Sequence, residues 1–390
     1  MPVPELRPYD IMRKTCCAIV IFIAIAPFAQ AGGVGNRTPS ESTTYLDDQT
    51  GATVTRLTTS PAQDDKVYQT HPNWIADGSH IIFNSDRTGT TELFALEEAT
   101  GDICQLTDGD SGAIVVSRDN DLMYLVRDNA VFAIDLQTLL ADSKSRAMKP
   151  AAAYRRHIAD VPPNCHLSGT YTEDADGNSL YFGLVDGSGQ STIQKLDIGA
   201  RRFTKVLDVP FKLGHCQAHP TKSGIISYCH ETGGDAPQRM WITHADGTGN
   251  RPFYTETYDE WVTHEVWWTE DRMLFAIWPK DETMKQRPYG IASVSLTDFT
   301  HTFHDQFPYW HVCGTPDGKY AIGDTFQGEL FLVDITTGKR TLLTQGHRPP
   351  GAKSHQHQSL SPDGKRVLFV SSKFGNWDLM SVDLPTTKGN

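Results

Sequence analysis

Residues 311–346 read HVCGTPDGKYAIGDTFQGELFLVDITTGKRTLLTQG. Apolar residues alternate with polar ones here, and Asp-Gly and Thr-Gly pairs interrupt the alternation at turn positions. This pattern predicts four antiparallel strands: one from His311, then Tyr320–Asp324, Glu329–Asp334 and Arg340–Thr344. A unit of four short strands that repeats along a chain is typical of a β-propeller blade.

Related units recur along the chain. They begin near residues 70, 113, 165, 215, 263, 310 and 356, at intervals of roughly 43 to 52 residues. The unit from residue 113 is shorter than the others, and the unit from residue 165 matches the pattern less closely. The repeats predict an all-β fold, a single seven-bladed β-propeller. A six-bladed ring with one degenerate insertion is the alternative.

The last unit is incomplete, and its missing part lies at the other end of the repeats. Residues 357–385 stop after a third strand, whereas residues 45–58, YLDDQTGATVTRLT, carry a turn and a fourth-strand pattern. We therefore expect an N-terminal strand to complete the last blade and close the ring, which removes exposed sheet edges. Residues 45–390 form the propeller domain in this interpretation, and residues 32–44 form a polar tail.

The N-terminus has the features of a secretory signal. Basic residues precede an apolar run from Cys16 to Phe28, and Ala29-Gln30-Ala31 follows as a cleavage site. This predicts a signal peptide over residues 1–31 and a mature protein that is periplasmic or secreted. An uncleaved membrane anchor is the alternative.

Charge and cysteine content limit the classes of partner. The formal net charge of −12 disfavours nucleic acid and, once the signal is removed, anionic membranes as partners. Five cysteines remain after residue 31, and they are too scattered for a disulfide framework. Buried free thiols are expected, with a Cys165–Cys216 bridge as the alternative.

Four histidines hold the same place in their repeats. Each precedes a turn dipeptide by six residues: His71, His264, His311 and His357. Equivalent positions of a radial repeat converge, so these side chains are expected around the central axis. His355 precedes His357 by two residues, so both rings lie on one face if the segment is extended. We predict a divalent-metal site of His311, His355 and His357, suited to Mn²⁺ or Zn²⁺; the alternative is a set of polar residues that plugs the channel.

A second group of polar residues lies between Leu213 and Trp268. Arg239 at a strand edge offers two parallel hydrogen bonds to a carboxylate, and His215 and His230 belong to the same repeat. Four tryptophans in this region are candidates for stacking on sugar rings, although most propeller tryptophans are core residues: Trp241, Trp261, Trp267 and Trp268.

The order of these motifs resembles the oligogalacturonate lyase family, polysaccharide lyase family 22. The resemblance is carried by LGH, YCHE, RMW, THE, WHVCGTPDG and the terminal H-x-H-x-S-x-S-P-D-G, from about Leu213 to Leu384. It implies a seven-bladed propeller that cleaves short oligogalacturonides by β-elimination with a bound Mn²⁺-type ion.

The resemblance also implies roles for single residues. His264 matches the family's base, Arg239 its substrate-binding arginine, and His311, His355 and His357 its metal ligands. The family also has a glutamine ligand, and the position that matches it here is Ala352. The expected substitutes are water, Gln356 or Gln358; the alternative is a weaker affinity for the metal. His215 and His230 remain further candidates for contact with the substrate or for protonation of the leaving group.

The expected function is therefore metal-assisted cleavage of a uronic-acid oligosaccharide. The alternative from another class is a non-catalytic periplasmic propeller that binds proteins, since repeats ending in S-P-D-G-K also occur in such modules. A scaffold has no need of the axial histidines, which distinguishes the two. A propeller hydrolase is disfavoured because the chain lacks a G-x-S-x-G motif.

Overall fold

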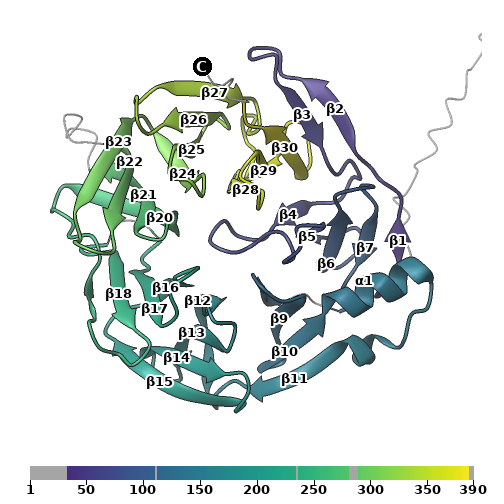
Figure 1. The fold of residues 1–390 in the computed structure, drawn as a ribbon, viewed down its shortest axis with the longest axis horizontal. Coiled ribbons are helices and arrows are strands. Elements are labelled where there is room, and N and C mark those ends of the chain that lie inside the picture. Colours follow the sequence, from purple (N-terminus) through teal and green to yellow (C-terminus); the bar gives the residue numbers. More distant parts are fainter. Residues whose placement is uncertain (1–32, 110–111, 234–235, 281–288, 386–390) are drawn as a thin grey trace, which may run out of the picture.

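The protein is described from a computed structural model that covers residues 33–109, 112–233, 236–280 and 289–385. Across these residues, seven antiparallel sheets surround a common axis (Figure 1). The prediction of an all-β, seven-bladed propeller is confirmed. The predicted signal peptide, residues 1–31, lies outside the described residues.

Each blade is built from consecutive strands, with the innermost strand first except where noted below. Blades 1 to 4 contain β4 (Asp64–Lys66), β5 (His80–Ser85), β6 (Glu92–Glu97) and β7 (Ile103–Gln105); β8 (Ala113–Val116), β9 (Leu122–Arg127), β10 (Ala130–Asp135) and β11 (Arg155–Asp160); β12 (Cys165–Glu173), β13 (Ser179–Asp186), β14 (Ser191–Asp197) and β15 (Arg202–Val209); and β16 (Leu213–Ala218), β17 (Ile225–His230), β18 (Met240–His244) and β19 (Arg251–Pro252). Blades 5 to 7 contain β20 (Glu260–Trp267), β21 (Arg272–Pro279), β22 (Gly290–Ser295) and β23 (His301–Gln306); β24 (Tyr309–Gly314), β25 (Tyr320–Thr325), β26 (Leu330–Asp334) and β27 (Arg340–Thr344); and β28 (Ser359–Leu360), β29 (Arg366–Ser371) and β30 (Asp378–Asp383).

The N-terminal segment closes the ring. Strand β3 (Thr53–Arg56) pairs with β30, with Val54 opposite Val382, so blade 7 is completed from the start of the described chain as predicted. Strand β2 (Thr43–Leu46) adds a further strand outside β3, and β1 (Arg37–Thr38) pairs with β7 of blade 1. Residues 32–44, which were predicted to be a polar tail, thus contain β1 and the start of β2, and both strands pair with the propeller. The polar composition of the segment did not reveal these strands.

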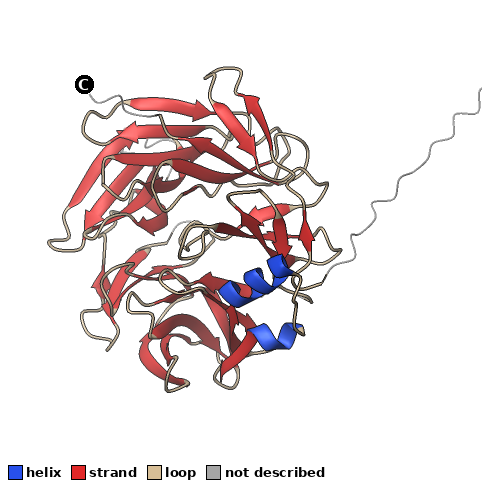
Figure 2. Cartoon of the chain, turned by 45° about the vertical axis from the view of Figure 1, so that its right-hand side comes forward, coloured by secondary structure: helices blue, strands red, loops and turns tan. Residues whose placement is uncertain are grey.

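Apolar residues of neighbouring blades pack against each other at every junction of the ring. Between blades 4 and 5, for example, Met240 packs with Val262 and Phe275. The junction of blades 1 and 2 is covered from outside by helix α1 (Leu136–Ser145), whose Leu136, Leu139 and Leu140 join that cluster (Figure 2). Asp135 caps the helix by accepting a hydrogen bond from the Thr138 backbone N–H. Neither this helix nor the 3₁₀ turn η1 (Ala151–Tyr154) was predicted.

Four adjacent innermost strands carry an irregularity near the axis. The register shifts between Leu167 and Tyr171 in β12, Gly214 and Gln217 in β16, Thr263 and Val266 in β20, and Tyr309 and Val312 in β24. A bulge leaves residues unpaired and redirects their side chains. His215 and His264 fall within these bulges, and both have positive φ, 42° and 54°. Such backbone angles are unusual away from glycine and concentrate at functional sites.

Blade 1 differs because the loop that follows β4 reaches toward the centre of the ring (Figure 1). This axial loop, Val67–Asn73, contacts blades 3, 5, 6 and 7 through His71, Tyr68, Gln69 and Asn73 respectively. The inner strand of blade 1 had been expected from residue 71 onward, but the loop takes that place and β4 lies before it.

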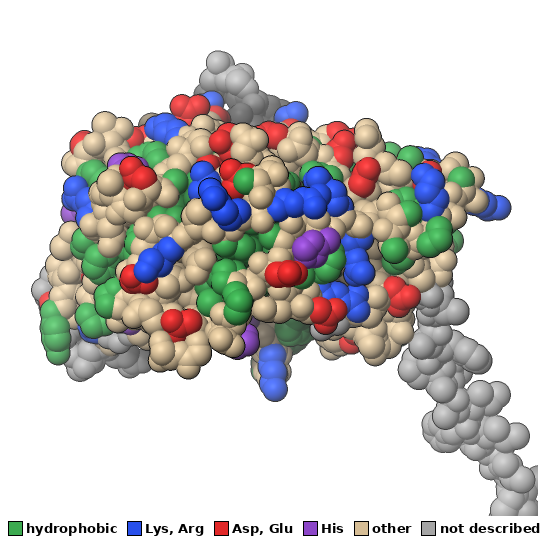
Figure 3. Space-filling view, turned by 90° about the horizontal axis from the view of Figure 1, so that it is seen from below, with side chains coloured by type: hydrophobic (Ala, Val, Ile, Leu, Met, Phe, Trp, Pro, Cys, Tyr) green, Lys and Arg blue, Asp and Glu red, His purple; other side chains and the backbone are tan. Residues whose placement is uncertain are grey.

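The outer surface mixes charges of both signs, as the side of the ring in Figure 3 shows. No helix in the described part of the chain is long and apolar enough to cross a membrane. The five described cysteines are buried and free, as expected, and Cys165 and Cys216 are not bridged.

Candidate active site

Three histidines of blades 6 and 7 meet at the axis. Ligand atoms of His311, His355 and His357 all lie within 4.8 Å of one another. The structure therefore brings the predicted metal group together, although not through an extended strand. Residues 352–358 form a loop before β28, and His357 has φ 43°. The two-residue periodicity of an extended strand, on which the sequence prediction relied, therefore does not explain why His355 and His357 lie together.

His311 is held by a carboxylate that sequence reasoning did not identify. Its Nδ1 lies 2.8 Å from Asp324 Oδ2, and its backbone N–H donates to Asp324 Oδ1. Both side chains are completely buried, and His311 Nε2 has no hydrogen-bond partner. A histidine held at one nitrogen and open at the other is the usual arrangement of a metal ligand with its supporting carboxylate. Asp324 is the last residue of the second strand predicted for this repeat, which could have drawn attention to it.

Neighbouring groups contact His355 and the backbone of His311. Trp310 Nε1 donates to His355 Nδ1 at 3.3 Å, which leaves Nε2 of His355 for a ligand. Gln358 Nε2 donates to the His311 carbonyl at 2.8 Å, while Gln358 Oε1 has no partner. Of the two glutamines considered as substitutes for a ligand at Ala352, Gln358 is the one with an unpartnered side-chain oxygen; in Gln356 the unpartnered atom is the amide nitrogen.

His264 lies against this group. Its ring centroid is 4.2 Å from that of His311, and its Nδ1 is 3.2 Å from the hydroxyl of Tyr68 on the axial loop. His264 Nε2 has no hydrogen-bond partner. Burial, together with the neighbouring His311, lowers the pKa of His264 well below its usual 6.5, so the ring is neutral. Tyr68 lies between residues 45–58 and the first full repeat, which begins near residue 70, so no periodic signal pointed to it.

Arg239 is part of a buried ion-pair network beside His264. Its Nε donates to Glu265 Oε2 at 3.1 Å, and Glu265 Oε1 lies 3.1 Å from Nδ1 of His215. A second carboxylate, Glu231, lies 3.6 Å from the Arg239 guanidinium. Burial alone would raise the pKa of Glu265, but Arg239 and His215 outweigh it and lower that pKa below its ordinary value. Glu265 follows His264 directly and was not singled out from the sequence.

The remaining candidates pack against neighbouring residues or are bonded to them. His230 stacks on Phe211 with ring centroids 4.3 Å apart. His71 is in contact at both nitrogens, with Thr70 Oγ1 and with the Tyr171 carbonyl at 2.7 Å. Trp241, Trp267 and Trp268 pack in the clusters between blades, whereas Trp261 contacts Trp310 beside the axis.

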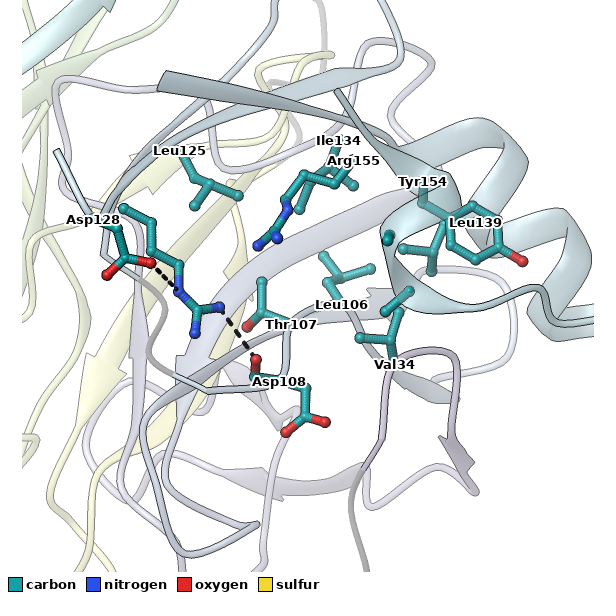
Figure 4. Close-up of a pocket in the computed structure, with 13 residues that line it drawn as sticks. Val34, Leu106, Thr107, Asp108, Leu125, Asp128, Ile134, Leu139, Tyr154 and Arg155 are labelled. Atoms are coloured by element: carbon teal, nitrogen blue, oxygen red, sulfur yellow. Dashed lines mark hydrogen bonds and ion pairs between the residues drawn. The ribbon is translucent and has the colours of Figure 1, made fainter. Parts of the chain in front are cut away.

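A separate cavity of about 310 Å³ lies between the N-terminal segment, blade 2 and α1 (Figure 4). Apolar side chains such as Leu106, Leu139 and Tyr154 form its wall, and Arg127 at its edge is held by the Asp108 carbonyl and by Asp128. The cavity contains none of the converging histidines, so the axial group is the stronger candidate.

Comparison with known proteins gives a consistent result at the level of the family. A protein-family profile described as oligogalacturonate lyase matches residues 33–339. Among relatives, an oligogalacturonide lyase of Pectobacterium atrosepticum is 24% identical over 91% of this chain and 99% of the relative. An oligogalacturonate lyase of Dickeya dadantii is 25% identical over 88% of this chain and 96% of the relative.

Solved structures share the fold. An oligogalacturonate lyase in complex with manganese superposes with a TM-score of 0.80 at 23% identity, covering 91% of this chain and 99% of that one. An oligogalacturonate lyase of Vibrio parahaemolyticus gives a TM-score of 0.80 at 20% identity, over 92% of this chain and all of that one.

Proposed function

The chain belongs to the oligogalacturonate lyase family, and from that premise we propose that it cleaves short oligogalacturonides by metal-assisted β-elimination. The product is a 4,5-unsaturated uronide. The observation that carries the proposal is the axial group itself: three histidines with ligand atoms within 4.8 Å of one another, directly beside a fourth histidine with an unpartnered Nε2.

The residues at the axis fit a divalent ion such as manganese. His311, His355 and His357 would hold it, since His311 offers a buried, unpartnered Nε2 and is oriented by Asp324. Imidazole nitrogens with room for oxygen ligands suit Mn²⁺ as well as Zn²⁺, and a relative with the same fold is a manganese complex. When bound, the ion supplies positive charge to the substrate carboxylate and so makes the neighbouring C5 proton more acidic.

His264 is the proposed base that removes the C5 proton. Nε2 has to carry a lone pair for this role, so the ring proton must lie on Nδ1 and be donated to the Tyr68 oxygen 3.2 Å away. Burial keeps His264 neutral before the reaction, as a base requires. As the C5 proton moves to Nε2, the electrons of the C5–H bond form the C4–C5 double bond and the C4–O bond breaks. The oxygen of the departing sugar takes the electron pair of that bond and acquires a proton from water.

Arg239 is proposed to contact a substrate carboxylate. Its position is set by Glu265, which also orients His215, so the three act as one unit. His215 and His230 are proposed as further substrate contacts on the same blade. The network means that loss of Glu265 would disturb both Arg239 and His215.

The alternative, a non-catalytic binding module, offers no role for open histidine nitrogens in a buried position. One assay separates the two: parent protein with Mn²⁺ and oligogalacturonides of two to about six sugars, monitored by the ultraviolet absorbance of the unsaturated product. We expect product from the parent and none after chelation, with activity restored by Mn²⁺. If no uronic-acid oligosaccharide of any type yields that product, the binding-module function replaces the lyase.

We further propose that the protein is exported and acts in the periplasm or outside the cell, on the basis of the N-terminal sequence alone. The basic residues, the apolar run and Ala29-Gln30-Ala31 support this proposal. N-terminal sequencing of the native protein is expected to start at Gly32; an intact N-terminus would contradict it.

A further inference from the structure

A row of aromatic side chains extends outward from the axial histidines on blades 5 and 6. Trp310 lies next to His264, with ring centroids 4.7 Å apart, and donates its indole N–H to His355. Phe326, in the turn between β25 and β26, packs on Trp310 at 4.3 Å between centroids and is 40% exposed. Trp278 and Trp261 support Trp310 from the blade 5 side. The row begins at the proposed base and ends at solvent.

An arginine lies at the outer end of this row. Arg348 belongs to the loop between β27 and β28, and its guanidinium carbon is 5.9 Å from the Phe326 ring centroid. Its side-chain contacts are two long hydrogen bonds, both 3.4 Å, to the carbonyls of Phe326 and Ala352. No carboxylate in the described part of the chain lies within 4.0 Å of it, whereas Arg239 on the other side of the axis has two.

The backbone fixes Arg348 close to Phe326. The His347 N–H donates to the Gly328 carbonyl at 3.1 Å. A Cβ added at Gly328 would lie 2.3 Å from the backbone nitrogen of Arg348. Gly328 has φ 76°, so a glycine is needed there both for the turn and for this approach. The turn that carries Phe326 and the loop that carries Arg348 therefore form one surface.

We propose that Arg348, Phe326 and Trp310 form a second uronate-binding subsite, which takes the sugar adjoining the one that is deprotonated. A uronate has a carboxylate and an apolar face of C–H bonds. A guanidinium binds the carboxylate with two parallel hydrogen bonds, and an aromatic ring packs against the apolar face. The proposal rests on the proposed lyase function, and it names the part of the site that selects a chain of at least two acidic sugars over a single one.

Steady-state kinetics on trigalacturonate test this subsite. A hydrogen bond to a charged group contributes about 1.5–3 kcal/mol, so R348Q is expected to raise KM about 10- to 100-fold with kcat changed by less than about threefold. R348K keeps the charge but not the paired hydrogen bonds and is expected to recover part of the KM. F326A is expected to raise KM by a smaller factor.

Two matched variants serve as controls. Arg251 also lies over a phenylalanine, Phe299 at 3.7 Å, but on outer strand β19; R251Q should leave KM unchanged. Phe374 is likewise exposed in the equivalent turn of blade 7, where it packs on Tyr45; F374A should leave KM unchanged. Thermal unfolding and bound Mn²⁺ are measured for every variant, and R348K serves in place of R348Q if the latter does not fold.

Two outcomes overturn the subsite. The first is a KM for R348Q within twofold of the parent; the second is a fall in kcat with unchanged KM, which would place Arg348 with the axial histidines instead of with the substrate. Failure of the lyase function is distinguishable from both, because then the parent itself gives no unsaturated product.

Discussion

His71 is buried and His264 is half-buried near the axis of the ring, and their ring nitrogens have opposite surroundings. His71 contacts Thr70 through Nδ1 and the Tyr171 carbonyl through Nε2, so both nitrogens are in use. His264 contacts Tyr68 through Nδ1 and leaves Nε2 open. One ring joins the axial loop to blade 3, and the other is available to a ligand.

The difference teaches that position at the axis is not sufficient to assign a role. A buried polar atom without a partner is costly, so a fold retains one mainly where something else binds or reacts there. The predictions below test whether open atoms mark function and occupied atoms mark structure.

Replacing His264 is expected to have the largest effect. H264A should lower kcat on oligogalacturonides by about 10²–10⁴-fold, the usual contribution of a general base. Bound Mn²⁺ and thermal stability should stay near those of the parent, because the metal group does not include His264. The check is the initial rate of unsaturated product alongside metal analysis.

H71Q is the matched variant for this comparison. It should lower the melting temperature through loss of the contacts to blade 3, yet keep kcat per folded molecule within a few-fold of the parent. A folded H71Q protein that lost kcat as severely as H264A would break the contrast between the two histidines.

The carboxylate behind His311 comes next. D324N cannot accept hydrogen bonds from both the His311 ring and its backbone N–H, so it should weaken Mn²⁺ binding by about 10- to 100-fold. Titration of the metal-free protein with Mn²⁺ measures this without substrate. D378N alters another buried aspartate, which pairs with Arg56 in blade 7, and should leave the Mn²⁺ affinity unchanged. Equal affinities in D324N and the parent would show that Asp324 only supports the strand.

The repeat pattern predicted the seven blades and the ring closure because turn pairs and alternating strands are local signals. It also predicted the meeting of His311, His355 and His357, although His357 reaches the group through a loop with positive φ. Tyr68, Asp324 and Arg348 were not predicted as site residues. Tyr68 and Arg348 lie on loops outside the repeat, and the partner of Asp324 is fixed by folding of β24 against β25. Strand β2 was missed because its segment is polar, and α1 was missed because it is inserted between β10 and β11, where the repeat pattern has only a turn.

Tyr68 should have a moderate effect on rate. Y68F removes the oxygen that accepts the proton of His264 Nδ1, so the ring is no longer held in the form that leaves Nε2 open. A single hydrogen bond contributes about 1 kcal/mol, so kcat should fall about fivefold with little change in KM. The pH profile of kcat should shift as well, which a loss of packing alone would not cause. A Y68F protein with the parent's kcat and pH profile would remove Tyr68 from the mechanism.

The smallest expected effect concerns stability and acid. Burial lowers the pKa of His71 from 6.5 to about 4, against the opposing influence of its bond to the Tyr171 carbonyl. Between these values the unfolded chain binds a proton at His71 that the folded protein does not, so the free energy of unfolding should fall as pH falls from 6.5 toward 4, and should not depend on this group above 6.5. The slope from one histidine is at most about 1.4 kcal/mol for each pH unit. Urea unfolding across this interval should show a shallower decline for H71Q than for the parent, because the other buried histidines are common to both proteins and cancel in the difference. Parallel declines would mean that His71 takes up its proton in the folded state as readily as in the unfolded one, and that burial does not hold it neutral.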